Sequence, residues 1–508
     1  MKHKIILVIL FIAAVALYIL TMKGVTGNPA PSMIKGNLDQ ATRPFELSPE
    51  RGRYLLTMSL AEAGSFALPQ MYADAAYPDV GYYQGRFYIF FAPGMSLFAL
   101  PFYYIGKYFG MAQVGAFSVA TIFTLLNLVV LYRMARDIFK LSVPHSLIPP
   151  FIFGFASTGW SYAVTLYQHQ TSTFYILSGV YAVWQYSQKN TRAWAWALYV
   201  WFIYGCAILI DYPNALLMLP IMVYFFLSSV SLIEVRRKLA LHIRWVFLST
   251  ATLFAIIMLA HGYYNFANFG GWTRVSGSLI GYKSIIEKQL SDPNKSAELQ
   301  RLEQEKDPIG FFSEYNFPFG LYTLTVSSDR GLFVYYPIYL LALFGLYYAI
   351  KNTNPVHKTM IAVAAINFFL YASFGDPWGG WAFGPRYLIP TMAILSLYVA
   401  LWLATTRYKI VSQLSAVVLF GYSLAIALAG VLTSIAIPPK IEADYLKTFH
   451  NFMLNFEHVK YGASSSVLFN EYFSRFMPLM YYYGALFGVV LVMFIVVVAW
   501  SRRYRYEY

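Results

Sequence analysis

The segment G-D-P-W-G-G-W-A-F-G, from Gly375 to Gly384, is followed by Pro385-Arg386-Tyr387 and lies between the apolar runs 359–374 and 387–405. Both runs are long enough to cross a bilayer. An acid, an arginine, aromatic rings and closely spaced glycines at a membrane surface make a poor anchor. They suit a pocket where backbone approaches a ligand closely and a fixed cation meets an anion.

Apolar runs of this kind recur along all 508 residues, of which 58% are hydrophobic and 12% charged. Soluble domains average about 25% charged residues, so we expect an all-α polytopic membrane protein. The run after Lys4 is interpreted as an uncleaved first helix, and the proline-interrupted run 92–109 as a re-entrant or surface helix. Cys206 is the one cysteine, which excludes a disulfide framework. The twelve predicted spans are 4–22, 113–132, 146–160, 171–188, 194–210, 214–232, 243–262, 331–350, 359–374, 387–405, 410–436 and 477–500.

The distribution of charge predicts the orientation of these spans. With both termini in the cytoplasm, the short inside segments hold 18 of the 37 Lys and Arg residues and only three acids. This asymmetry agrees with the positive-inside rule, so the formal charge of +14 reflects topology and does not indicate nucleic acid.

The long connections all fall outside, at 23–112, 263–330 and 437–476. Long connections are usually functional or disordered, and the charged stretch from Lys283 to Asp307 is interpreted as a solvated segment that could act as a lid. The chain contains no Walker A or Rossmann fingerprint. The sequence therefore predicts one membrane domain, residues 1–508, that works on its extracytoplasmic face without nucleotides.

Two carboxylates of the first outside loop are candidates for acid–base chemistry. Glu50 follows Ser48-Pro49, where Ser48 is a candidate helix N-cap and Glu50 is either a first-turn acid or a catalytic base. Asp79 opens D-V-G-Y-Y-Q-G-R-F-Y, a pattern typical of a hairpin, and is either its turn residue or a second functional carboxylate. Arg86, on the same hairpin, could pair with either acid or with a phosphate.

Further polar residues lie at predicted outside ends of spans. His169 is either an interfacial polar residue or part of a site, and Asp211, followed by Tyr212, is either an N-cap or a ligand-binding group. Arg330 and Arg386 each precede a span directly. They either snorkel to the interface or hold a phosphate, and nearby glycines favour the phosphate.

Most Tyr and Trp residues at span ends are expected to form interfacial belts. Trp378 and Trp381 differ because they lie within the glycine-rich segment, where their faces could stack on a sugar ring.

Taken in order, these motifs resemble the GT-C superfamily of membrane glycosyltransferases. The resemblance covers most of the chain and is closest to phospholipid-carrier-dependent bacterial enzymes related to protein O-mannosyltransferases and the lipid A aminoarabinose transferase. The motifs that carry it are Arg53-Tyr54, D-x-G…G-R-F-Y…P-G-x-S-L (79–97), His169, D-Y-P (211–213), Y-N…F-G (264–270), S-x-x-R-G-L-F (327–333) and W-G-G…G-P-R-Y-L-I-P (378–390).

The resemblance implies a GT-C-like bundle that transfers a sugar from a polyprenyl-phosphate donor to a lipid, glycan or protein acceptor, with inversion. Glu50 would be the general base and Asp79 the second candidate. The donor's phosphate and sugar would meet residues at nine positions: Arg53, Arg86, His169, Asp211, Tyr212, Arg330, Trp378, Arg386 and Tyr387. No cofactor and no metal constellation are expected, and the membrane would be the bacterial inner membrane.

The chain departs from this family at one position. Relatives usually carry a lysine where this chain has Phe91 of F-A-P-G. Two alternatives therefore stay open beside the transferase: a non-catalytic member of the same fold, and a transporter or flippase for a lipid-linked glycan. A transporter would need polar residues deep within the spans, whereas most acids of this chain lie in the outside loops.

Overall fold

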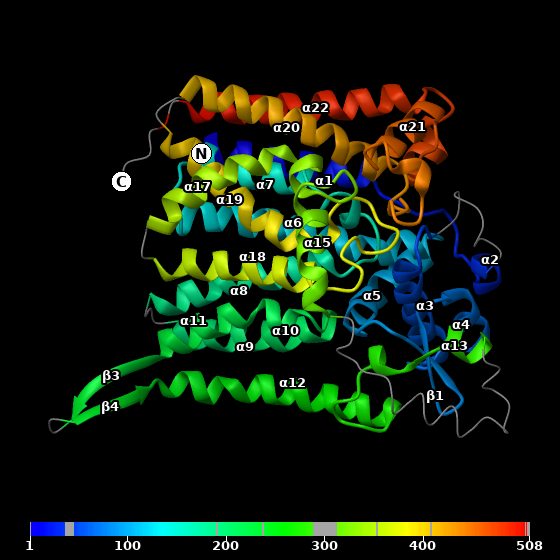
Figure 1. The fold of residues 1–508 in the computed structure, drawn as a ribbon, viewed down its shortest axis with the longest axis horizontal. Coiled ribbons are helices and arrows are strands. Elements are labelled where there is room, and N and C mark those ends of the chain that lie inside the picture. The colour runs from blue at the N-terminus through cyan, green and yellow to red at the C-terminus, as the bar shows by residue number, and fades with distance from the viewer. Residues whose placement is uncertain are drawn as a thin grey trace.

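A computed structural model describes residues 2–35, 45–188, 192–235, 238–287, 312–351, 354–406, 409–502 and 504. Its main feature is a bundle of long, roughly parallel helices, with most of the shorter elements gathered at one end (Figure 1). The predicted helical class is confirmed, with the addition of two small antiparallel sheets.

Eight of the described helices are long and apolar enough to cross a membrane. They are α1 (Lys2–Leu20), α6 (Ala112–Asp137), α9 (Ala193–Ile210), α12 (Trp245–Phe269), α18 (Pro355–Ala372), α19 (Ile389–Thr405), α20 (Lys409–Leu432) and α22 (Leu479–Ser501).

Shorter or less apolar helices occupy the other predicted spans. They are α7 (Val143–Phe155), α8 (His169–Ser187), α10 (Asn214–Leu217) with α11 (Leu219–Ser229), and α16 (Leu332–Tyr335) with α17 (Leu340–Lys351). A helix thus lies within each predicted span, while the count of twelve crossings stays a prediction.

Helix α19 forms the centre of the bundle. It packs against α7, α8, α17 and α18, and 89% of the residues in its most apolar 18-residue stretch are buried. A helix that is apolar all round is expected in such an interior position. By contrast, α12 runs along the edge of the bundle (Figure 1), and only 11% of the residues in its most apolar 18-residue stretch are buried. Its exposed apolar side chains suit contact with lipid.

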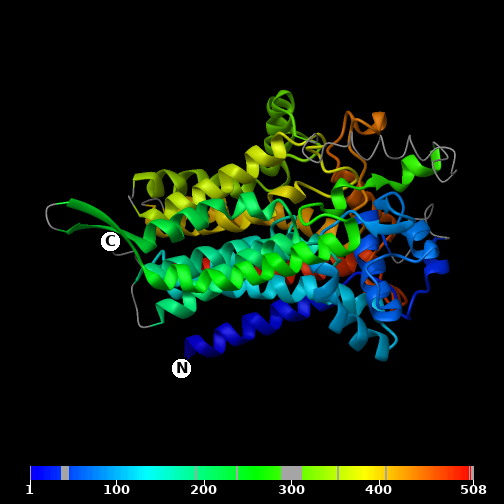
Figure 2. The same ribbon diagram turned by 90° about the horizontal axis from the view of Figure 1, so that it is seen from below.

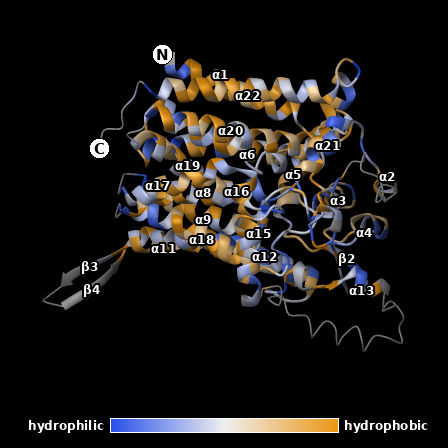
Figure 3. Ribbon diagram, turned by 45° about the horizontal axis from the view of Figure 1, so that its top comes forward, coloured by the Kyte–Doolittle hydropathy of each residue, from blue (hydrophilic) through white to orange (hydrophobic). Residues whose placement is uncertain are grey.

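The opposite ends of the bundle differ in polarity. One end carries α3 (Ser48–Ala63), α4 (Gln70–Ala76), α5 (Gly94–Tyr108) and α21 (Met453–Tyr461), and more hydrophilic residues occur there than along the bundle (Figures 1 and 3). We call this the loop end. The remaining short helices are α2 (Pro31–Lys35), α13 (Tyr282–Glu287) and α15 (Phe317–Thr325).

A three-stranded antiparallel sheet, of order β2-β1-β5, supports the loop end. Strand β1 (Val80–Tyr83) pairs with β2 (Arg86–Ile89) in the register Val80 to Ile89, and β5 (Ile280–Gly281) adds to its other edge. The hairpin turn is Gln84-Gly85, and both residues have positive φ. Asp79 precedes β1, so its interpretation as a turn residue was wrong.

The other end of the bundle carries a hairpin, β3 (Val230–Val235) with β4 (Lys238–Ile243), which extends away from the helices (Figure 1). At this end the start of α1 contacts the end of α22: the rings of His3 and Trp500 stack with their centroids 5.4 Å apart. Helix α1 lies along the outside of the bundle (Figure 2).

Several local predictions can be compared with these elements. The run 92–109 forms helix α5 at the loop end. The cap of α3 is Leu47, so the prediction of Ser48 as N-cap was wrong; Ser48 is the first helical residue. Of the proposed lid, residues 283–287 belong to α13, and the rest lies outside the described residues.

Candidate active site

Two arginines far apart in sequence meet at one aromatic ring at the loop end. The guanidinium carbon of Arg386 lies 5.6 Å from the centre of the Tyr167 ring, and that of Arg53 lies 5.8 Å from it. Arg53 is also stacked on Phe91, at 4.2 Å. Such contacts hold guanidinium groups in place while leaving their N–H edges available.

Three elements bring these side chains together. Arg53 lies on α3 and is 2% exposed, and its Nη1 donates to the carbonyl of Pro49 at 3.0 Å. Arg386 follows Gly384, whose φ of +61° turns the chain into the first residues before α19. Tyr167 precedes α8. Burial lowers the pKa of Arg53 to about 10, and the nearby Asp211 opposes this shift.

Aromatic rings form the wall around the arginines. His169, the first residue of α8, stacks on Tyr167 with centroids 5.8 Å apart and meets Tyr162 edge-on. Tyr387 stacks on Tyr371, with centroids 4.2 Å apart. His169 is therefore buried in the site and is not an exposed interfacial residue.

Asp79 and Asp211 lie near these cations. The Oδ2 atom of Asp79 accepts a hydrogen bond from Ser48 Oγ at 2.5 Å, and that of Asp211 accepts from Gln168 Nε2 at 3.2 Å. Burial raises the pKa of both carboxyl groups, while Arg53 and Arg386 oppose the shift. Asp211 is the C-cap of α9 and does not cap α10, whose N-cap is Pro213, so the N-cap prediction was wrong.

Glu50 is 1% exposed, and its two carboxylate oxygens differ in their partners. Its Oε1 accepts the backbone N–H of Glu46 at 2.6 Å and of Leu47 at 3.3 Å, which satisfies donors at the start of α3. Burial, with repulsion from Glu46, raises the pKa of Glu50 to about 8. Such a pKa lies close to the pH at which a general base must work.

A polar cavity of about 320 Å³ borders Glu50. The segments after α1, before α3 and around α21 form its wall. The side chains and backbone that line it are Lys23, Gly24, Val25, Glu46, Glu50, Phe117, Thr165, Ser434, His458, Gly462, Ala463, Ser464, Ser465 and Asn470.

Buried polar atoms without a hydrogen-bond partner concentrate around the arginines and Glu50. Buried polar groups are normally paired, so such a concentration indicates room for a ligand or water. Within the part of the chain that the structure describes, these atoms include Glu50 Oε2, Arg51 Nε, Arg53 Nε, Thr165 Oγ1, Tyr167 OH, His169 Nε2, Asp376 Oδ1, and Arg386 Nε and Nη1.

Arg330 has a different environment from Arg386. It is fully buried and forms a 2.7 Å ion pair with Asp329. Its other donors reach the carbonyls of Trp378, Gly380 and Ile437, at 3.3, 3.5 and 2.9 Å. The guanidinium therefore holds the glycine-rich segment in place, and its hydrogen-bonding capacity is used within the protein.

The side chains of other predicted residues make contacts elsewhere. Arg86 is exposed at the β1–β2 hairpin, and Tyr212 lies beside His261, with ring centroids 6.0 Å apart. Trp378 packs edge-on against Phe319. Trp381 is 48% exposed and donates to Glu442 at 2.7 Å.

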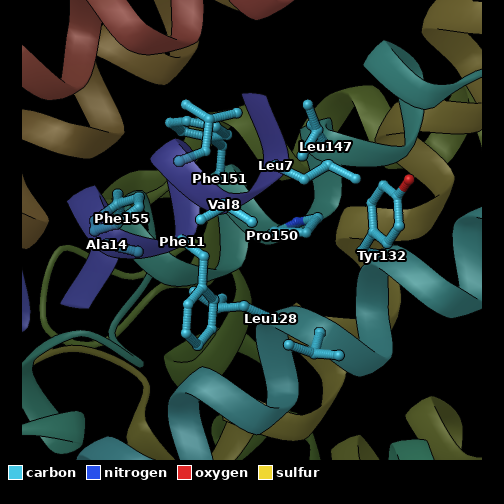
Figure 4. A pocket seen from close by; sticks show the side chains of 12 residues that line it. Leu7, Val8, Phe11, Ala14, Leu128, Tyr132, Leu147, Pro150, Phe151 and Phe155 are labelled. Carbon is cyan, nitrogen blue, oxygen red and sulfur yellow. The ribbon is translucent and has the colours of Figure 1, made fainter. Parts of the chain in front are cut away.

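A second cavity, of about 290 Å³, is lined almost wholly by apolar side chains of α1, α6 and α7. Leu7, Phe11, Leu128, Pro150 and Phe151 face it (Figure 4). It offers space for hydrocarbon, and its lining residues include no carboxylate, amine or imidazole, so the polar cavity and the arginines are the better candidates for chemistry.

The described residues contain no group of three or more His, Cys, Asp or Glu side chains placed to hold a metal ion. Several residues of the site were not predicted from the sequence. Lys23 and Tyr371 lie near span ends, and Glu46 lies within the first outside loop; no motif in the sequence distinguishes these three residues from their neighbours. Tyr167 adjoins His169, and that adjacency was the available signal.

Comparison with protein-family models and with curated proteins gave no match. Similar solved structures include ArnT from Cupriavidus metallidurans, with 13% identity over 97% of this chain and 76% of ArnT. Its TM-scores are 0.47 for the apo state and 0.49 for the form bound to undecaprenyl phosphate. The archaeal oligosaccharyltransferase AglB from Archaeoglobus fulgidus, in complex with an inhibitory peptide and a dolichol-phosphate, has 13% identity and a TM-score of 0.49. The match covers 86% of this chain and 56% of AglB. Both likenesses are distant.

Proposed function

We propose that this protein transfers a sugar from a polyprenyl-phosphate carrier to an acceptor hydroxyl at its loop end, which faces away from the cytoplasm. The observation that carries the proposal is the pair Arg53 and Arg386 around Tyr167, each with a buried N–H that lacks a partner among the described residues. Guanidinium groups bind phosphate strongly, and they lie beside a carboxylate suited to act as a base.

In this proposal, Arg386 and Arg53 bind the donor phosphate. The apolar surface of the bundle keeps the polyprenyl chain in the membrane, and the rings of Tyr167 and Tyr387 border the sugar. Positive charge at the phosphate stabilises the charge that develops on the leaving group in the transition state. Because the arginines supply this charge, the proposal includes no metal, and EDTA is expected to leave activity unchanged.

The departure from the family pattern at Phe91 fits this assignment. The Phe91 ring supports the guanidinium of Arg53 at 4.2 Å, so a cation is present beside the position where relatives carry lysine. In this proposal Arg53 of α3 supplies the positive charge that the lysine between β2 and α5 supplies in relatives. This supports an active transferase over a non-catalytic member.

The proposed step is a single inverting displacement. The acceptor hydroxyl oxygen forms a bond to the anomeric carbon while the bond from that carbon to the phosphate oxygen breaks. The bonding electrons leave with polyprenyl phosphate, and the hydroxyl proton passes to Glu50 Oε2. Asp79, close to Arg51 and Arg53, balances the positive charge of the site.

The test is mass spectrometry of purified protein with a panel of short-chain polyprenyl-phosphate sugars. Released polyprenyl phosphate that depends on Glu50 and Arg386 would support the proposal and identify the sugar. Intact donor that moves across proteoliposome membranes without any product would instead support a transporter. Donor binding without turnover, in the presence of acceptor extracts, would support a non-catalytic member.

A further inference from the structure

The polar cavity beside Glu50 has a charge balance that limits what it can bind. Lys23, which is 2% exposed, donates to Glu46 at 2.9 Å and to the carbonyl of Thr433 at 2.6 Å. Glu46 also accepts from Ser434 Oγ and from the backbone N–H of Ile435. The ammonium and the carboxylate of the wall therefore neutralise each other.

The other titratable groups of the wall add little charge at neutral pH. Burial lowers the pKa of His458, which favours its neutral form. The pKa of Glu50, raised by burial to about 8, keeps this group mostly protonated at pH 7. An anionic ligand would thus meet no unpaired cation among the described lining residues.

What the cavity does offer is hydrogen bonding beside an aromatic ring. Glu50 Oε2 and Thr165 Oγ1 are buried, belong to side chains that are each 1% exposed, and lack partners among the described residues. Ser464, Ser465 and Asn470 add hydroxyl and amide groups, and Phe117 adds an apolar face. Its volume of about 320 Å³ lies at the lower end of the range for small-molecule sites, about 300–1,000 Å³.

We propose that this cavity binds the acceptor, and that the acceptor is a neutral polyhydroxyl group, a sugar of a glycan, and not a phosphorylated sugar. The inference rests on the proposed function and deepens it. Glu50 lines the cavity and lies one helical turn before Arg53 on α3. In this proposal the acceptor hydroxyl enters from the cavity while the donor phosphate is held at the arginines.

The test uses the full-length protein in lipid nanodiscs. Saturation-transfer NMR measures binding of neutral di- and trisaccharides of hexose, N-acetylhexosamine and pentose, each beside its phosphorylated counterpart and a serine-containing peptide. The variant Ser465→Trp fills the cavity and leaves the arginines unchanged. Ser313→Trp makes the same substitution outside the cavity and is the matched control.

We expect at least one neutral saccharide to bind the wild type and Ser313→Trp equally, with affinity about tenfold or more weaker in Ser465→Trp. Preferential binding of phosphorylated sugars or peptide, unchanged binding in Ser465→Trp, or no binding by any neutral saccharide would overturn the inference. Release of polyprenyl phosphate is measured on the same samples. Saccharide binding that persists without any release would refute the proposed function and leave the cavity assignment standing.

Discussion

Glu50 is at once part of the helix start and part of the site. Its Oε1 satisfies backbone donors before α3, its Oε2 is buried without a partner among the described residues, and the residue lines the polar cavity. Glutamine can reproduce the first interaction, because its carbonyl oxygen accepts the same N–H groups, but it cannot take up a proton at neutral pH. Substitution by glutamine therefore separates structure from chemistry.

We expect Glu50→Gln to reduce sugar transfer by about 10²- to 10⁴-fold, the usual contribution of a general base. Wild-type activity should rise about tenfold per pH unit up to pH 8, because Glu50 must lose its proton to act. Glu62→Gln, on the same helix but paired with Lys107, is the control and should retain activity. Near-normal transfer in Glu50→Gln would remove Glu50 from the mechanism.

The same pKa shift predicts the pH dependence of stability. The folded protein holds the Glu50 proton more tightly than the unfolded chain, whose glutamate has its ordinary pKa of 4.5. This contribution to the free energy of unfolding is complete below pH 4.5 and is lost as the pH rises towards 8. In detergent, the unfolding temperature of Glu50→Gln should therefore fall less steeply between these pH values than that of the wild type.

Arg330 and Arg386 carry the same group but differ in their partners. Arg330→Ala should destabilise the protein by about 3–5 kcal/mol, because it leaves Asp329 and three carbonyls without their partner. Arg386→Ala should leave the unfolding temperature nearly unchanged, yet weaken polyprenyl phosphate binding about 10- to 100-fold, the value of one charged hydrogen bond. The unfolding temperature and polyprenyl phosphate affinity are measured for both variants. If the two variants lower each quantity by the same amount, the distinction between Arg330 and Arg386 is wrong.

The glycine-rich segment, Gly375 to Gly384, connects α18 to α19 and sets the position of Arg386. Gly379, Gly380 and Gly384 have positive φ, so the segment turns sharply within a few residues. At Gly384 a Cβ would also lie 2.5 Å from Thr158 Oγ1. The element thus depends on glycine for both conformation and space.

We expect Gly384→Ala to lower stability by about 1–3 kcal/mol and to reduce donor binding, because strain at this turn displaces Arg386. Gly484→Ala, within α22, is the matched control, since a Cβ there meets nothing within 4 Å. It should be neutral or stabilising by up to about 1 kcal/mol. Equal unfolding temperatures for the two variants would show that the turn tolerates a side chain.

The molecule as a whole separates its charged inside segments from its site. The stacked rings of His3 and Trp500 bring the first and last spans together at one end, and the arginines lie at the other. Since the basic residues predict that the end with His3 is cytoplasmic, the site is expected to face outward.

A reporter that is active only in the cytoplasm should accordingly be active when it is fused after Tyr508. In a Cys206→Ser background, Trp381→Cys should react with a membrane-impermeant thiol reagent added from outside, because Trp381 is exposed at the loop end. His3→Cys in the same background is the control and should react only after the membrane is opened. Labelling of His3→Cys in intact cells would refute the orientation.

Hydropathy was sufficient to predict a mostly helical protein with several apolar helices long enough to cross a membrane, and charge asymmetry adds the prediction that the long loops lie outside. These features are local along the chain, because a bilayer selects apolar runs one at a time. The sequence also placed Glu50, Asp79, Arg53, His169, Asp211 and Arg386 among the candidates for one site, and the structure brings them to the same end of the bundle.

Tertiary contacts decide whether the polar groups of each candidate residue are paired within the protein or left without a partner. Arg330 and Arg386 look alike in sequence, but the partners of Arg330 come from residues 378, 380 and 437, whereas Arg386 keeps N–H groups that no described residue accepts. Phe91 marks a missing lysine in the motif, yet it supports Arg53 from another element. Whether a buried charge is satisfied depends on atoms hundreds of residues away, so only the folded chain separates a structural cation from one that can bind phosphate.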